Sequence, residues 1–134
     1  MKTYALDSNM ISFFLKGNTA VIERIATVIN ENHSIVIPPI VYYEVKRGLL
    51  MINATKKLSN FEDFCKSFPV GEFGNYIMEE AVEIYVKERK EKRNTEDADI
   101  FIAVFCMHND YILVTDNTKH FQNIKNLRLE NWKQ

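Results

Sequence analysis

The chain has only two cysteines, one tryptophan and a formal net charge of −1. Cys65 and Cys106 lie in apolar helical patterns, so we expect both to be core residues rather than partners in a disulfide. No apolar run approaches the roughly 20 residues that a membrane-spanning helix needs. Overall charge gives no argument for a polyanionic partner, which must be inferred from local patches instead. Composition therefore argues against a disulfide-stabilised scaffold and against a membrane-spanning protein.

The length of the chain fits a single domain over residues 1–134, which is long enough to bury a core. Hydrophobic residues make up 46% and charged residues 26%, which is typical of soluble globular proteins. Residues 1–7 lack the apolar stretch of a signal peptide and reach an acidic residue at once. We therefore expect a cytoplasmic protein with no membrane partner.

Short β-branched runs alternate with helical patterns along the chain. Strands are predicted at 2–6, 34–37, 111–115 and 127–129, and helices at 10–15, 19–29, 39–50, 53–68, 75–93 and 96–106. Thr19 is predicted to cap the second of these helices. The alternation predicts an α/β fold with a central, mostly parallel sheet of about five strands and helices on both faces.

The stretch Glu96–Cys106 places three carboxylates directly before an unbroken apolar run. The next apolar run, Tyr111–Val114, is short and β-rich, so it is predicted as the strand and the first run as a helix. Thr95 or Asp97 is predicted to cap that helix. Asp99 then lies in the first helical turn at the edge of a core, where an ionised carboxylate is costly unless it is paired or bound to a cation.

Further acids occur at corresponding places of other predicted elements: a strand ends at Asp7, a helix that follows a strand begins near Glu44, and a late strand ends at Asp116. Each acid alone is explained equally well as a helix cap or a turn residue. The carboxyl ends of parallel strands share one edge of a sheet, so these side chains and Asp99 are expected to converge. Several carboxylates in one pocket require a compensating cation, and oxygen-only ligands indicate Mg²⁺ or Mn²⁺.

Basic residues close to these acids are candidates for phosphate contacts. Lys46 and Arg47 lie within one turn of Glu44, and Lys119 follows Asp116 closely. The charged segment 87–93 is interpreted instead as a solvated helix end. The three histidines lack the spacing of zinc ligands, which argues against a zinc site.

The order and spacing of these motifs resemble those of PIN-domain ribonucleases, and within that family the VapC-type toxins of toxin–antitoxin pairs. The resemblance spans nearly the whole chain and lies in the segments Leu6–Asn9, Tyr43–Gly48, Asp97–Ala103, Leu113–Phe121 and Leu129–Trp132. The acids of the family correspond to Asp7, Glu44 and Asp99. Ser8 stands where the family usually has threonine. The fourth polar position corresponds to Asn117, whereas Asp116 carries the charge; the sequence leaves this choice open, and Asp97 is an auxiliary candidate.

The resemblance implies an Mg²⁺-dependent endoribonuclease toxin, with Mn²⁺ as a substitute metal. Asp7 and Asp99 would hold the cation, while Glu44 with Asp116 or Asn117 would act through water. The implied substrates are structured RNAs such as tRNA or ribosomal RNA. The implied partners are a small antitoxin and a second copy of the chain, with an apolar groove expected at the helices after Gly17 and around Tyr42–Phe64.

Two other functions are compatible with parts of the pattern. A non-catalytic PIN-like module that binds RNA or protein would have the same fold, although such relatives usually lose acids that this chain keeps. A receiver-like signalling domain also gathers acids around Mg²⁺, but it normally has two adjacent acids near its first strand. Leu6 and Ser8 flank Asp7 here, which argues against that alternative.

Overall fold

The computed structural model describes residues 1–133. Within them, β1 (Thr3–Leu6), β2 (Ser34–Val36), β3 (Ile112–Val114) and β4 (Leu129–Glu130) form one parallel sheet in the order β2-β1-β3-β4. The helices are α1 (Ser8–Leu15), α2 (Thr19–Asn30), α3 (Pro39–Met51), α4 (Thr55–Ser67), α5 (Tyr76–Lys90), α6 (Asp97–Asn109) and α7 (Thr118–Phe121). The predicted α/β class with a parallel sheet is confirmed. The expected five strands are too many for the described residues, since Ile37 and Val70 form only an isolated bridge.

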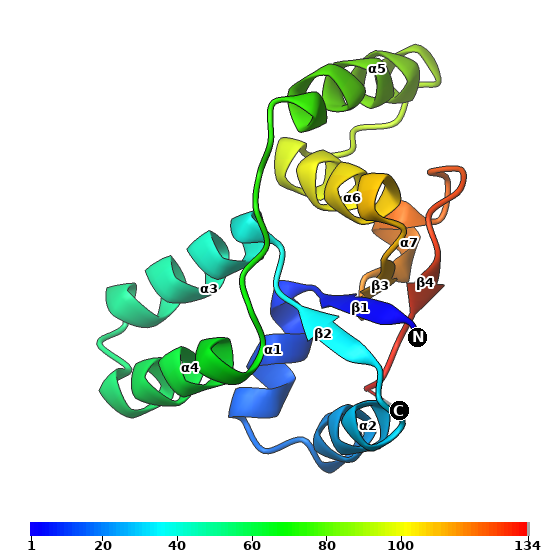
Figure 1. Cartoon of the computed structure of the whole chain (residues 1–134). Helices are drawn as coiled ribbons and strands as arrows, with labels where there is room; N and C mark the ends of the chain where they lie inside the picture. Colours follow the sequence, from blue (N-terminus) through cyan, green and yellow to red (C-terminus); the bar gives the residue numbers. More distant parts are fainter. Residues whose placement is uncertain (134) are drawn as a thin grey trace.

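The helices are arranged in layers around the short sheet (Figure 1). α5 and α6 lie on one side of the strands, and α1 and α2 lie on the other. α3 and α4 pack together as a pair, and α1 contacts both of them. None of the helices in the described part of the chain is both long and apolar enough to cross a bilayer.

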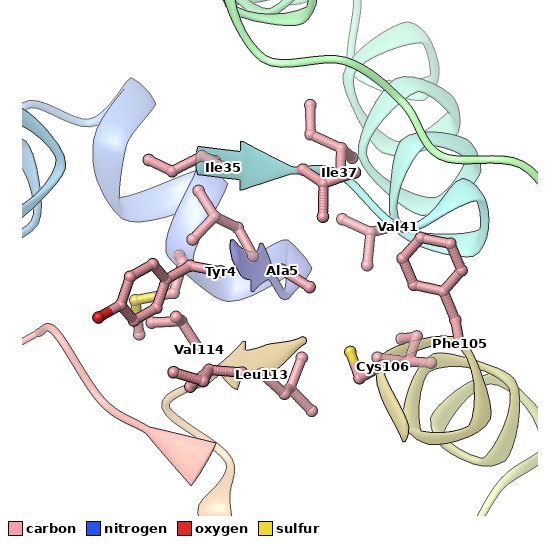
Figure 2. Close-up of a cluster of buried hydrophobic side chains, with 14 of the residues drawn as sticks. Tyr4, Ala5, Ile35, Ile37, Val41, Phe105, Cys106, Leu113 and Val114 are labelled. Atoms are coloured by element: carbon pink, nitrogen blue, oxygen red, sulfur yellow. The ribbon is translucent and has the colours of Figure 1, made fainter. Parts of the chain in front are cut away.

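The core on the α6 side fixes the direction in which the first acid points. Ala5 of β1 pairs in register with Leu113 of β3, and both side chains point toward Cys106 of α6 (Figure 2). Tyr4 points to the opposite side of the sheet. Residues two apart on a strand face the same way, so Asp7 follows Ala5 toward the α6 side. Cys106 is fully buried and carries no disulfide, as the sequence predicts.

Two predicted helix caps are wrong: a different side chain caps α2, and no side chain caps α6. Asn18, rather than Thr19, caps α2 by accepting a hydrogen bond from the Val21 backbone N–H at 3.1 Å. α6 begins after Glu96 without a side-chain cap. The Thr95 hydroxyl is committed elsewhere, because it donates to Glu88 Oε1 at 2.7 Å.

A buried ion pair holds the connection between α5 and α6. The Glu88 side chain is only 4% exposed and accepts hydrogen bonds from Arg93 Nε at 2.9 Å and Arg93 Nη2 at 2.5 Å. Arg89 donates to the backbone carbonyls of Arg93 and Thr95. The interpretation of segment 87–93 as a solvated helix end is therefore wrong for Glu88, whose network fixes the loop that leads into α6.

We expect Glu88→Ala to lower the free energy of unfolding by about 1.5–3 kcal/mol at neutral pH, the usual value of hydrogen bonds to a charged group. The Arg93 hydrogen bonds hold the pKa of Glu88 below its usual value. Its contribution is therefore present above the unfolded-state pKa and is lost as the pH falls through the lower, folded-state pKa. Urea unfolding at neutral and acidic pH would measure this effect.

Glu91→Ala is the matched control, because Glu91 also contacts Arg93 but its side chain is 45% exposed. An exposed pair of this kind contributes less than about 1 kcal/mol. Equal losses of stability in the two variants would contradict the role assigned to the buried pair.

Candidate active site

Asp7 lies at the end of β1 and is the most deeply buried acid of the predicted set, with 4% of its surface exposed. Its carboxylate accepts hydrogen bonds from the Ser8 backbone N–H at 2.8 Å and from the Thr115 hydroxyl at 2.7 Å. Burial raises the pKa of Asp7, and these hydrogen bonds oppose the rise. Asp7 is thus a buried carboxylate at the edge of the core, and the hydrogen bonds that it accepts offset only part of the cost of burying its charge.

Thr115 is a site residue that the sequence analysis missed. It is fully buried at the end of β3, where its hydroxyl donates to Asp7 and accepts from Asn9 Nδ2 at 3.2 Å and from the Asn117 N–H at 3.0 Å. Asn9 also accepts from the Asp116 N–H at 3.0 Å. The only sign in the sequence that Thr115 could bond Asp7 is its position at the end of the strand that pairs with β1.

Glu44 and Asp99 face the same edge of the sheet as Asp7. Glu44 comes from α3, and Asp99 comes from the first turn of α6. The pKa of each is raised, first by burial and next by the negative charge of Asp7. The three carboxylates are therefore close enough to disfavour one another's ionised forms, and the structure brings together the acids predicted from the sequence.

His120 and Glu96 are further members of this edge that the sequence analysis did not assign to it. His120 Nδ1 lies 3.3 Å from Asp99 Oδ2, and the histidine charge lowers the pKa of Asp99. The charge of Glu96 raises the pKa of both Glu44 and Asp99. Asp97, the predicted auxiliary acid, is exposed at the first position of α6.

The structure separates the two candidates for the fourth polar group. The Asp116 carboxylate accepts a hydrogen bond from Asn131 Nδ2 at 3.0 Å and lies 3.9 Å from Lys133 Nζ. Asn117 lines a cavity together with Ser8 and Glu44. The side chain of Asp116 is thus held toward the carboxyl-terminal segment, whereas Asn117 faces the acids.

The predicted RNA-binding residues lie in two different surroundings. Lys46 donates to the Tyr42 hydroxyl at 3.1 Å, and the Arg47 guanidinium lies 4.8 Å from the Tyr43 ring centroid. These two bases border an apolar hollow of α3. Lys119 instead lines a cavity that includes Asp99, so it is the base beside the acids.

The carboxylate oxygens of Asp7, Glu44 and Asp99 are the kind of ligand that a hard divalent cation prefers, and they lie at an edge partly shielded from water. Within residues 1–133, the ion pair with His120 is the only one made by Asp7, Glu44 or Asp99. No three acidic, histidine or cysteine side chains of this part of the chain already converge on one cation position. A bound cation would offset the repulsion between these carboxylates.

We expect Glu44→Gln to stabilise the metal-free protein at neutral pH by up to about 1 kcal/mol, the usual limit for interactions between partly exposed charges. The raised pKa of Glu44 means that its ionised form is disfavoured in the fold. The protonated form of Glu44 is not disfavoured in this way. The free energy of unfolding of the wild type should therefore fall relative to that of the variant as the pH rises through the pKa of Glu44 in the folded protein.

Thermal unfolding in chelator from pH 4 to pH 8 would measure this difference, with Glu62→Gln on the exposed part of α4 as the control. A variant that is less stable than wild type at neutral pH would show that Glu44 has a favourable partner in the metal-free fold.

Comparisons with known proteins support the resemblance found in the sequence, although no protein-family model matches the chain. Ribonuclease VapC1 of Haemophilus influenzae strain R2866 is 23% identical over 143 residues, which cover 96% of this chain and 97% of the relative. The same enzyme from strain 86-028NP is equally similar.

Solved structures agree with these relatives. VapBC2 from Rickettsia felis, bound to a DNA fragment from its promoter, contains a chain with a TM-score of 0.89 and 23% identity, covering 97% of this chain and 98% of that chain. VapBC-1 from nontypeable Haemophilus influenzae gives a TM-score of 0.86 at 24% identity, covering 98% and 99%. The resemblance to VapC-type PIN-domain toxins is therefore confirmed, and the chain has the fold of these proteins.

Proposed function

We propose that the protein is a metal-dependent endoribonuclease toxin that hydrolyses RNA phosphodiester bonds. The observation that carries this proposal is the gathering of Asp7, Glu44 and Asp99 at one edge of the sheet, where burial raises the pKa of all three and the negative charge of Asp7 further raises those of Glu44 and Asp99. Such a set is costly for folding and has an evident use only when a cation binds it. The relatives named ribonucleases support RNA as the substrate.

In this proposal Asp7 and Asp99 hold Mg²⁺, or Mn²⁺ in its place, and Glu44 with Asn117 acts through water. Asn117 is preferred to Asp116 because it lines the cavity of Glu44, whereas Asp116 is bound by Asn131. The bound cation would polarise a phosphoryl oxygen and lower the pKa of water. Thr115 and Asn9 keep Asp7 in place, and Ser8 lies where its hydroxyl can reach a ligand.

We expect purified protein to cut a total-RNA pool into discrete fragments in Mg²⁺ or Mn²⁺ but not in chelator. Asp99→Asn keeps the shape of the side chain and removes its charge. Its activity should fall by at least the roughly 10–100-fold that loss of an outer-shell partner costs a metal site. Gel analysis and sequencing of fragment ends would measure both results.

Asp63→Asn is the matched control, because Asp63 is an exposed acid of α4 whose side chain is 70% exposed. Cleavage that persists in chelator, or in Asp99→Asn, would exclude the metal-dependent reaction. A folded wild-type protein that cuts no RNA with either metal would favour a non-catalytic module that binds RNA or protein.

The same proposal includes neutralisation by an antitoxin that binds an apolar groove. A hollow on the surface has an apolar part and a polar rim. It is lined by Phe14 and Leu15 of α1, by Phe64 of α4 and Phe68 just after it, and by Asn60, Asp63 and Ser67. Leu15 also lines the cavity that contains Glu44, so the groove continues toward the acids. The similar solved structures are toxin–antitoxin complexes, which supports a protein partner at such a surface. In this proposal the antitoxin occupies the hollow between α1 and α4.

We expect Ser67→Trp to weaken the complex with the cognate antitoxin that this proposal requires. Ser67 is exposed at the rim of the groove, so the indole would fill the hollow without disturbing the core. Overfilling of a packed contact typically costs about 1–3 kcal/mol. Co-purification after co-expression would measure the loss, and Lys56→Trp, on an exposed part of the same helix, is the control. Equal co-purification of both variants would place the partner elsewhere.

A homodimer is also part of this proposal. The side chains of Met78, Val82, Tyr85 and Val86 on α5 form an exposed apolar stripe, with exposed fractions of 41–60%. They recur at the three- and four-residue spacings of one helix face. An apolar stripe of this kind suits a self-complementary contact with a second copy of the chain.

A further inference from the structure

A cavity of about 310 Å³ opens beside Asp99, between the α5–α6 loop and α7. This volume is at the lower end of the range for small-ligand pockets, which suits one nucleotide unit rather than a larger ligand. The cavity is distinct from the hollow on the other side of the acids that contains Ser8, Glu44 and Asn117. It is therefore a second surface from which a substrate can reach the same carboxylates.

The side chains that line the cavity are of two kinds: some are hydrogen-bonded within the protein, and others have no hydrogen-bond partner in the described residues. Arg93 and Thr95 both donate hydrogen bonds to the Glu88 carboxylate, which gives this part of the wall a fixed shape. Asn94 and Asn123 line the cavity with exposed amide side chains that make no hydrogen bond within residues 1–133. These amides are free to pair with a ligand.

The distribution of charge indicates which part of a nucleotide fits inside. Glu96, which the proposed function does not assign to the cation, lines the cavity, and its carboxylate disfavours a phosphate group beside it. This carboxylate favours hydrogen-bond donors, such as the ring N–H and exocyclic amino groups of a base. Lys119, at the same cavity, is exposed and supplies positive charge for an adjacent phosphate.

Guanine presents a ring N–H and an amino group side by side on its pairing edge, and a carboxylate can accept from both at once. Uracil offers only one ring N–H on that edge. Single-stranded RNA is commonly recognised through such unpaired edges, and the imidazole of His120 offers a surface on which a base can stack. Glu96 is well placed for this contact, because its side chain caps no helix.

Resting on the proposed ribonuclease function, we propose that this cavity binds the unpaired base next to the scissile phosphodiester and prefers guanine through Glu96. Asn94 and Asn123 bond the remaining polar atoms of the base, and Lys119 contacts a flanking phosphate. The cavity thereby contributes to the choice of cleavage site, while Asp7, Glu44 and Asp99 carry out the reaction.

Fluorescence anisotropy with short labelled oligouridines tests the proposal. The probes carry a central guanosine, adenosine or cytidine, or remain all uridine, and binding is measured in Mg²⁺ with Glu44→Gln as the non-cleaving parent. We expect the parent to bind the guanosine probe about tenfold more tightly than the all-uridine probe, a usual value for one bidentate base contact. Adding Glu96→Gln should reduce that ratio to within about twofold.

Lys119→Ala should weaken binding of all four probes by a similar factor and keep the guanosine preference, because phosphate contacts carry no base information. The combined Asn94→Ala and Asn123→Ala change should lower the preference as Glu96→Gln does. Glu83→Gln and Gln122→Ala, two exposed positions outside the cavity lining, should leave the ratio unchanged.

A parent without base preference, or a guanosine preference that survives Glu96→Gln, would overturn the proposal. Cleavage of total RNA by the wild-type protein is scored separately, so the two hypotheses fail in different ways. Cleavage without base preference would remove only the cavity assignment. Base preference without cleavage would keep the assignment and remove the ribonuclease function.

Discussion

The buried carboxylate of Asp7 is the constraint on which the arrangement of the site depends. Burial disfavours its charge, and the fold opposes that cost with hydrogen bonds from Ser8 and Thr115. These bonds connect the end of β1 to the start of α1 and to the end of β3. The hydrogen bonds that reduce the cost of burying Asp7 therefore also hold β1 and β3 in register. Glu44 and Asp99 lie at the same edge of the sheet.

α6 contributes both to the hydrophobic core and to the acidic edge. Its Cys106 packs against the sheet near Ala5 and Leu113 (Figure 2), while Asp99 in its first turn faces Asp7. The helix has no side-chain cap at its start. The Glu88–Arg93 pair and the Thr95 hydroxyl hold the preceding loop instead. Contacts with α5 thus fix the start of α6, which a side-chain cap usually does. These contacts lie beside the proposed base-binding cavity.

The sequence predicted the parallel sheet and the meeting of Asp7, Glu44 and Asp99, because strand and helix periodicities place Asp7 at the carboxyl end of a strand and the other two in the early turns of helices. It did not predict the roles of Thr115 and Glu96 or the approach of His120 to Asp99, because these depend on contacts between segments far apart in the chain. A threonine at a strand end has the same local pattern whether or not its hydroxyl meets an acid. Asp116 and Asn117 were not separated for the same reason, since their surroundings include Asn131 and α3.

A molecule can reach the acidic edge from two sides with different lining residues, and this difference suggests how a protein partner would inhibit the proposed activity. On the α1 side, Leu15 joins the apolar groove of Phe64 to the cavity of Glu44. On the α7 side, the cavity of Asp99 is polar and lined by Asn94 and Asn123. Apolar burial favours a protein segment in the first, whereas hydrogen-bonding edges favour an unpaired base in the second. A bound antitoxin would therefore inhibit by occupying the acids from the α1 side, without having to imitate RNA in the α7 cavity.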